Sequence, residues 1–182
     1  MEQITQKKLY LVSGRVSEPL AHEVADLMGE ELGEPNLAEF SNGEIHCKFS
    51  ESIRGSDVFI LQTHCHTEEI SINDALMEQL IMVDAAKRAS AKRITVVCPH
   101  YGYARQDRKS SGREPITAKL VANLFKGAGA SRLIGVDLHS GQIQGFFDGP
   151  VDHLTAMPVL VERLKSLEGD LAIVSPDAGR VK

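Results

Sequence analysis

The 182-residue sequence has no tryptophan and only three cysteines, Cys47, Cys65 and Cys98. The cysteines are odd in number and far apart, and no CxxC pair occurs, which excludes a disulfide framework and a zinc ribbon. This cysteine usage is typical of a reducing compartment. We therefore predict a cytoplasmic protein.

Long apolar runs are also missing. No segment approaches eighteen uninterrupted apolar residues, and the polar N-terminal stretch MEQITQKKLYLVSG is unlike a signal peptide, so we expect no membrane or targeting segment. The formal charge of -5, with 42% hydrophobic and 25% charged residues, indicates an ordinary globular composition and argues against a nucleic-acid partner. This length predicts one domain, or one domain and a piece of another.

Two common nucleotide-binding signatures are absent as well. The sequence contains no GxxxxGK[ST] P-loop. Gly127-Ala128-Gly129 begins like a dinucleotide fingerprint, but position 132 is Arg and a predicted strand follows the segment instead of preceding it. A phosphate site in this chain would have to be built from other residues.

Short apolar runs rich in β-branched residues recur along the chain, and most lack polar alternation, as in strands buried on both faces of a parallel sheet. They are Leu9–Val12, Val58–Leu61, Ile94–Val97, Leu133–Val136 and Leu171–Val174. Helical periodicity fills the intervals, over Pro19–Leu32, Ser71–Arg88, Pro115–Lys126 and Pro158–Leu167. This alternation predicts an α/β fold with a doubly wound, mostly parallel sheet flanked by helices.

The segment Glu39–Ser50 breaks the alternation. Ile45, Cys47 and Phe49 alternate with polar residues after the turn Ser41-Asn42-Gly43, which predicts a β-hairpin that projects as a flap. Phe40 lies beside this polar turn and has little of its own chain to pack against. We expect a ligand or a neighbouring subunit to cover it.

Polar clusters follow the predicted strands where a ligand is expected, because open parallel sheets bind ligands beyond the carboxyl ends of their strands. A basic cluster follows Ile94–Val97, Asp137 and His139 follow Leu133–Val136, and Asp177 follows the last run. We expect Arg105, His139 and Asp177 to lie on one side of the sheet.

The basic cluster lies between Tyr101 and Lys119, in a chain that is negative overall. Its candidate ligand-binding residues are Arg105, Gln106, Arg108, Lys109 and Arg113. Guanidinium groups match phosphate oxygens bidentately, which favours a polyphosphate ligand. The alternative is a solvated loop whose charges face water, with Arg113 on a flexible tip after Ser110-Ser111-Gly112.

Asp137 and His139 are two residues apart, so on an extended chain both side chains would point to one face, where they could ligate a divalent ion. The alternative is an aspartate that caps the next helix beside a surface histidine. His64-Cys65-His66 and Cys98-Pro99-His100 match no structural zinc spacing, and we interpret them as ordinary residues at strand ends.

Three long strings combine residues of mixed chemistry: FSNGEI at Phe40–Ile45, YGYARQDRK at Tyr101–Lys109 with PITAK following, and DLHSGQIQGFFDGPVD at Asp137–Asp152. They closely resemble the ribose-phosphate pyrophosphokinase family, also called phosphoribosyl-pyrophosphate synthetases. Met77–Thr95 and Ser175–Gly179 are similar to the same family, so the resemblance spans Leu9 to Lys182. It implies a phosphoribosyltransferase-like, Rossmann-like fold. It also implies transfer of the pyrophosphoryl group of Mg-ATP to ribose 5-phosphate, giving phosphoribosyl pyrophosphate and AMP for nucleotide biosynthesis.

The resemblance also implies roles for residues at three places. On the flap, ATP would be bound by Phe40, Asn42, Gly43 and Glu44, which reach the site of a neighbouring subunit within dimers that assemble into a hexamer. On the loop, ATP would be bound by Arg105, Gln106 and Asp107. Mg²⁺ would be bound by Asp137, His139 and Asp177. Where many relatives have Asp, this chain has Asn42, whose amide can still hydrogen-bond adenine.

One departure from the family concerns its second domain. Family members carry there a catalytic Lys-Arg loop and an acidic loop that cradles the ribose phosphate, and neither occurs before Lys182. We therefore expect residues 1–153 to form the N-terminal α/β domain and residues 154–182 to begin a second, truncated one. The intact protein is expected to be an enzyme, and this segment alone to be nearly inactive. The alternative is a non-catalytic, nucleotide-binding regulatory relative that assembles with active subunits.

Overall fold

The computed structural model describes residues 8–175, and its central element is a six-stranded sheet in which every neighbouring pair is parallel. The strand order is β2-β1-β5-β6-β7-β8. In chain order, the strands are β1 (Leu9–Ser13), β2 (Leu32–Gly33), β5 (Asp57–Leu61), β6 (Arg93–Cys98), β7 (Arg132–Val136) and β8 (Val151–Leu154). The predicted α/β class and parallel sheet are confirmed.

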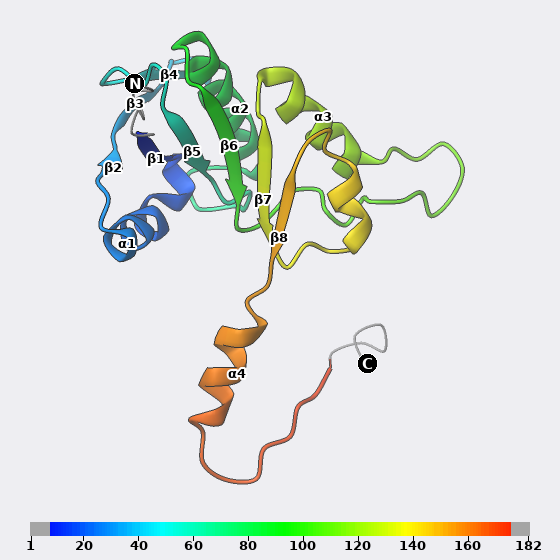
Figure 1. Cartoon of the computed structure of the whole chain (residues 1–182). Coiled ribbons are helices and arrows are strands. Elements are labelled where there is room, and N and C mark those ends of the chain that lie inside the picture. Colours follow the sequence, from blue (N-terminus) through cyan, green and yellow to red (C-terminus); the bar gives the residue numbers. More distant parts are fainter. Residues whose placement is uncertain (1–7, 176–182) are drawn as a thin grey trace, which may run out of the picture.

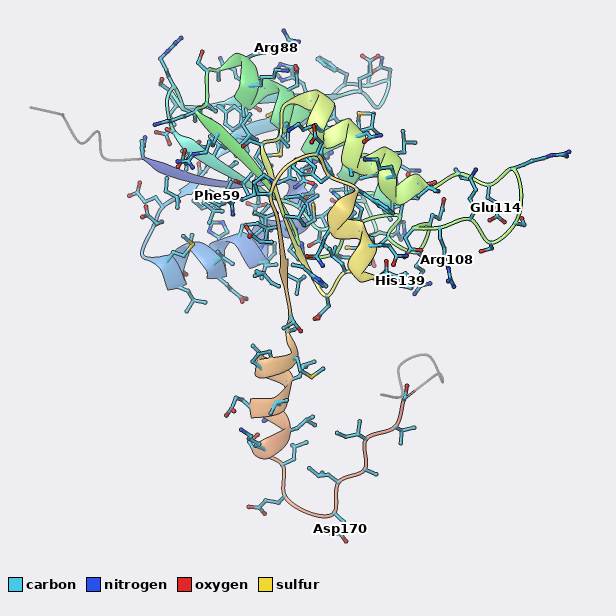
Figure 2. The ribbon with its side chains drawn as sticks, turned by 45° about the vertical axis from the view of Figure 1, so that its right-hand side comes forward. Phe59, Arg88, Arg108, Glu114, His139 and Asp170 are labelled. Atoms are coloured by element: carbon cyan, nitrogen blue, oxygen red, sulfur yellow. The ribbon has the colours of Figure 1, made fainter. Side chains whose placement is uncertain are left out.

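Helices cover both faces of this sheet (Figures 1 and 2). The helix α1 (Glu18–Met28) packs against β1 and β2, whereas α2 (Ile72–Arg88) packs on β5 and β6 and also against α3 (Thr117–Ala128). Two short 3-10 helices, η1 (Arg15–Ser17) and η2 (Gly141–Gly145), follow β1 and β7. The strands supply a β-branched core in which Val12, Val58, Ile60 and Val96 have no exposed surface. Strands buried from both sides explain the lack of polar alternation in the sequence.

The start of α2 is fixed by a capping box. The Ser71 hydroxyl oxygen accepts the Asp74 amide at 3.2 Å, and the Asp74 carboxylate accepts the Ser71 amide in return. Hydrogen bonds from the Ser71 side chain and backbone hold the pKa of Asp74 below its ordinary value. The helix was predicted over Ser71–Arg88, and its observed start one residue after the cap is typical of this motif.

The other two helices in the domain differ from their predicted bounds and faces. Helix α1 stops at the left-handed Gly29, not at Gly33, which lies in β2. It buries small residues, Ala21 and Ala25, while Leu27 is 89% exposed. Helix α3 starts at Thr117 and likewise buries Ala118, Val121, Ala122 and Phe125, leaving Ile116, Leu120 and Leu124 exposed. The large apolar residues that predicted the buried faces therefore lie largely on the surface.

The predicted flap is present as a separate antiparallel hairpin of β3 (Pro35–Glu39) and β4 (Ile45–Phe49), paired from Pro35↔Phe49 to Glu39↔Ile45. One face of the hairpin packs on α2 and the core through Leu37, Cys47 and Phe49. Burial raises the pKa of the Cys47 thiol to about 11.

The chain beyond β8 stands away from the sheet (Figure 1). Helix α4 (Met157–Lys165) has no buried residue, and Leu171, Ile173 and Val174 are exposed. The prediction of a strand at Leu171–Val174 is wrong for this structure, because that segment has no strand to pair with among the described residues. None of the helices between residues 8 and 175 is long and apolar enough to cross a membrane.

Candidate active site

A cavity of about 480 Å³ lies at the carboxyl ends of β6 and β7. It is lined by the start of α2, by the segment after β6 with Arg105 and Gln106, and by the segment after β7 with Asp137 and His139. The prediction that Arg105 and His139 share one side of the sheet is therefore confirmed. Asp177, which we expected beside them, lies outside the described residues.

A larger cavity, of about 1210 Å³, lies at the β2 edge of the sheet. Its lining includes one lysine, one histidine and five carboxylates. The carboxylates are Asp26, Glu30, Glu31, Glu34 and Glu51. A cavity of this charge repels phosphate. The smaller cavity, which carries Arg105, is the better candidate for a polyphosphate ligand.

The basic cluster divides between the cavity and the surface. Arg105 is exposed to the cavity and forms no ion pair with the residues that the structure describes, so its guanidinium is available to an anion. Arg108, Lys109 and Arg113 belong to a loop that projects from the domain, on which Figure 2 labels Arg108 and Glu114. The Glu114 carboxylate closes this loop by accepting the Ser110 and Ser111 amides and the Ser111 hydroxyl. These hydrogen bonds, above all those from Ser111, lower the pKa of Glu114.

Asp107 joins the two segments that line the cavity. Its side chain is buried, and its carboxylate accepts hydrogen bonds from the Ser140 hydroxyl and from Gln142 Nε2, the latter at 3.1 Å. These contacts tie the segment after β6 to the segment after β7. The geometry thus gives Asp107 a connecting role, and its predicted contact with ATP stays a prediction.

The two-residue spacing of Asp137 and His139 suggested an extended chain, but the structure does not have one there. Strand β7 ends at Val136, and Asp137 has a left-handed backbone with φ of 44°. Its two carboxylate oxygens accept the Thr155 hydroxyl at 2.9 Å and the Ala156 amide at 3.0 Å. These contacts hold the segment that leads into α4 against the end of β7, and among the described residues neither η2 nor α4 has a side-chain cap from the residue that precedes it. The predicted role of Asp137 as a metal ligand stays a prediction.

His139 is exposed and lies on the cavity wall. Within residues 8–175, no group of three or more histidine, cysteine or acidic side chains is arranged to hold a metal ion. One carboxylate and one imidazole do not form an all-protein cage. They fit Mg²⁺ only if phosphate oxygens and water supply most of its ligands, which is the usual arrangement for this ion.

The flap tip is a compact turn from Phe40 to Glu44. The Gly43 amide donates to the Phe40 carbonyl at 2.8 Å, with φ of 87° at Gly43, and the Glu44 amide donates to Asn42 Oδ1 at 3.2 Å. Phe40 is 57% exposed and meets only the edge of His46 among the rings described, at 6.0 Å between centroids. No flap residue is among those that line the cavity with Arg105.

Arg15 anchors the flap to the domain interior, and the sequence patterns did not single it out. Its Nε lies 2.5 Å from a carboxylate oxygen of Glu78, a residue of α2 with no exposed surface, and its Nη1 lies 3.5 Å from Glu39 at the end of β3. The Arg15 amide also donates to Glu78 at 2.8 Å. The available signal was Glu78 within the predicted helix Ser71–Arg88, because a carboxylate on the buried side of a helix requires a partner.

Comparison with known proteins shows the family of this chain. The sequence profile described as the N-terminal domain of ribose phosphate pyrophosphokinase matches residues 9–129. The chain belongs to the ribose-phosphate pyrophosphokinase family. The Bifidobacterium longum ribose-phosphate pyrophosphokinase is 54% identical over 180 residues, which are 97% of this chain and 52% of the relative. The Bacillus caldolyticus ribose-phosphate pyrophosphokinase is 53% identical over 97% of this chain and 54% of its own length.

A solved structure agrees as well. The crystal structure of phosphoribosylpyrophosphate synthetase from Mycobacterium smegmatis superposes with a TM-score of 0.82 and 52% identity, covering 87% of this chain and 52% of that one. This chain spans about half the length of the ribose-phosphate pyrophosphokinases it matches. The family resemblance and its fold, both predicted from the sequence strings, are therefore confirmed.

Proposed function

We propose that the full-length protein transfers pyrophosphate from Mg-ATP to ribose 5-phosphate, giving phosphoribosyl pyrophosphate and AMP. The observation that carries this proposal is Arg105, a cation that forms no ion pair within residues 8–175 and lies in a strand-end cavity, in a chain of this family. Such a transfer needs no covalent enzyme intermediate. It needs positioned phosphates and neutralisation of the charge on their oxygens.

Arg105 and Gln106 are proposed to hold the phosphate chain from the β6 side of the cavity, with Asp107 keeping their segment against η2. Mg²⁺ would be held from the β7 side by His139 and Asp137, together with Asp177, and would neutralise phosphate charge. The exposed guanidinium of Arg105 supports this division, because it can form a charge-assisted fork with two phosphate oxygens.

The adenine is proposed to contact the flap of a second subunit, through Phe40, Asn42, Gly43 and Glu44. The flap tip does not line the cavity of its own chain, and Phe40 is left exposed. Self-association into a hexamer of dimer units is part of this proposal. It is supported by the outward-facing apolar residues of α1 and α3, of which Leu27, Leu120 and Leu124 are examples.

The domain boundary near residue 153 is also proposed. The parallel sheet ends with β8 at Leu154, and α4 buries none of its residues against the domain. We infer that the Lys-Arg catalytic loop and the ribose-phosphate loop belong to residues after Lys182, so that residues 1–182 alone have little activity. The three cysteines are free, and a cytoplasmic location completes the proposal.

The test is Mg-ATP binding by the full-length protein, measured by titration calorimetry. Removal of the Arg105 guanidinium should cost about 1.5–3 kcal/mol, or roughly 10- to 150-fold in Kd, as for other hydrogen bonds to charged groups. Arg88→Ala is the matched control, because Arg88 lies far from His139 in Figure 2 and, within residues 8–175, forms its ion pair with the half-buried Asp84 of its own helix. Equal effects of the two substitutions would contradict the phosphate site.

A further inference from the structure

His64 is a buried histidine just beyond the end of β5, in contact with the chain that leaves β6. It has no exposed surface, and its amide donates to the His100 carbonyl at 3.1 Å. Its ring stacks on Phe125 of α3, with 5.9 Å between centroids and 14° between planes. Its Nδ1 accepts the Gly102 amide at 2.9 Å. The imidazole therefore holds the chain three residues before Arg105.

The hydrogen bonds around His64 allow one proton arrangement. Gln79 Nε2 lies 2.8 Å from the Ile60 carbonyl and 3.3 Å from the Val97 carbonyl, so it must be the amide nitrogen that points to the strands. Gln79 Oε1 then faces His64 Nε2 at 2.8 Å, and this nitrogen must carry the proton. The other nitrogen, Nδ1, is left as an acceptor, and the group that faces it is the Gly102 N–H. Carbonyls of β5 and β6 thus set the tautomer that holds Gly102.

This arrangement also excludes a metal role for His64 in the His64-Cys65-His66 motif. Both ring nitrogens are occupied by hydrogen bonds within the interior. Metal binding requires a free nitrogen lone pair, and the one at Nδ1 already accepts the Gly102 amide.

Gly102 approaches the ring too closely for any other residue. A Cβ added to Gly102 would lie 2.9 Å from His64 Cβ and 3.2 Å from Nδ1. Residue 102 must therefore be glycine for its amide to reach the imidazole. Next to it, the Tyr101 hydroxyl donates to the Ala118 carbonyl at 2.9 Å, which fixes the same segment to α3.

We propose that His64 is a positioning residue for phosphate binding: by holding the Gly102 amide, it sets the course of the chain that places Arg105 and Gln106 in the cavity. His64 itself does not line that cavity. The proposal rests on the function proposed above, because it takes the ligand of Arg105 to be the phosphate chain of ATP.

Two substitutions of His64 separate its hydrogen bond from its bulk. His64→Phe keeps an aromatic ring against Phe125 but removes the Nδ1 acceptor, whereas His64→Asn places an amide oxygen close to the position of Nδ1. We expect His64→Phe to raise the Kd for Mg-ATP about tenfold, because the contact between Arg105 and phosphate is no longer oriented. His64→Asn should retain most of the wild-type affinity. Val83→Ala, a truncation elsewhere in the core, controls for stability, since Val83 is buried on α2.

A second pair of substitutions avoids the buried ring altogether. Gly102→Ala should weaken ATP binding because its methyl group pushes the chain away from His64. Gly127→Ala is its control, since a Cβ at Gly127, within α3, meets nothing within 4 Å. Hydrogen–deuterium exchange of the peptide that spans residues 100–107 gives a readout that needs no ligand. We expect faster exchange there in His64→Phe and Gly102→Ala and unchanged exchange in both controls.

The outcomes distinguish this inference from the proposed function. If the wild-type protein fails to bind Mg-ATP, the proposed function fails, and exchange of residues 100–107 alone decides whether His64 holds this segment. If the wild type binds and His64→Phe loses no more affinity than Val83→Ala, the positioning role of His64 is overturned. Exchange as slow in His64→Phe and Gly102→Ala as in the wild type would overturn it as well.

Discussion

Buried polar side chains of α2 form two networks near the carboxyl edge of the sheet. Glu78 and Gln79 are neighbours on α2 without exposed surface, yet they face different networks, one toward Arg15 and the flap and the other toward His64 and the loop. Gln62 Nε2 donates to Glu78 at 2.8 Å and adds a neutral partner to the first network. Because a buried polar group without a partner costs stability, these residues specify how flap, helix and loop fit together.

His64 predicts how the stability of the domain depends on pH. Burial lowers its pKa from the ordinary 6.5 to about 4, although the Gln79 hydrogen bond acts in the opposite direction. The folded state therefore favours the neutral ring, and below about pH 6.5 the unfolded chain binds more protons. The contribution of His64 to the free energy of unfolding should be constant above about pH 6.5. It should fall by about 3 kcal/mol as the pH decreases to about 4, following the linkage relation.

The pH effect is measured by urea unfolding of residues 1–182 at pH 4 to 8, with His64→Asn as the comparison. The neighbouring thiol and phenol do not titrate between pH 4 and 8, because burial raises the pKa of Cys98 to about 12 and raises that of Tyr101 further. His100 is a neighbouring charge that also lowers the pKa of His64. We expect the free energy of unfolding of His64→Asn to fall less steeply as the pH decreases. Identical pH profiles for the two proteins would contradict the burial of a neutral imidazole.

At the scale of elements, the flap is notable because the tip of its hairpin packs against no hydrophobic core within residues 8–175. Its strands pack on α2, but Phe40 at the tip is 57% exposed. Phe40→Ala should weaken Mg-ATP binding in the full-length assembly about tenfold, as expected for loss of a ring buried by a ligand, and should leave the melting temperature of residues 1–182 unchanged. Phe40→Tyr, which keeps the ring, should bind as the wild type does. A fully active monomer in light scattering would contradict the shared site.

Local sequence patterns were sufficient to predict a strand or helix that could be recognised from its own residues. Strands β1, β5, β6 and β7, the flap and α2 were predicted from β-branched runs, period-two alternation and a capping residue. The strands β2 and β8 were not, because two to four residues carry too little periodicity. In α1 the core side carries alanines, and in α3 it carries alanines with Val121 and Phe125, while leucines of both helices lie outside. A period of about 3.6 therefore identified the helices but not their buried sides.

In the candidate site, too, one part could be predicted from the sequence and another could not. The rule for parallel sheets was sufficient to predict that Arg105 and His139 lie at one edge, because both follow strands of the same sheet. It could not find the contact of His64 with Gly102 or that of Arg15 with Glu78, because these partners are 38 and 63 residues apart in the chain. Such pairs are brought together by tertiary packing, on which local periodicity carries no information.

At the scale of the whole molecule, the sheet domain and the segment after β8 differ in how much they bury. Residues 157–175 include no buried side chain, whereas Thr155 and Ala156 bond to Asp137. A chain that ends at Ala156 should therefore melt at the same temperature as residues 1–182, with a difference in stability under about 0.5 kcal/mol. Circular dichroism measures this. A loss of several degrees would show that the later segment docks on the domain and would move the proposed boundary.

The most direct measurement of the central claim is product identity by ³¹P NMR, with the full-length protein, Mg-ATP and ribose 5-phosphate. We predict AMP and phosphoribosyl pyrophosphate in equal amounts, and a rate lower by about 100-fold or more in Arg105→Ala, as when one charge-stabilising group is removed from a transfer site. Arg88→Ala should be as active as the wild type. Formation of ADP, or equal rates for Arg105→Ala and Arg88→Ala, would contradict pyrophosphoryl transfer at this site.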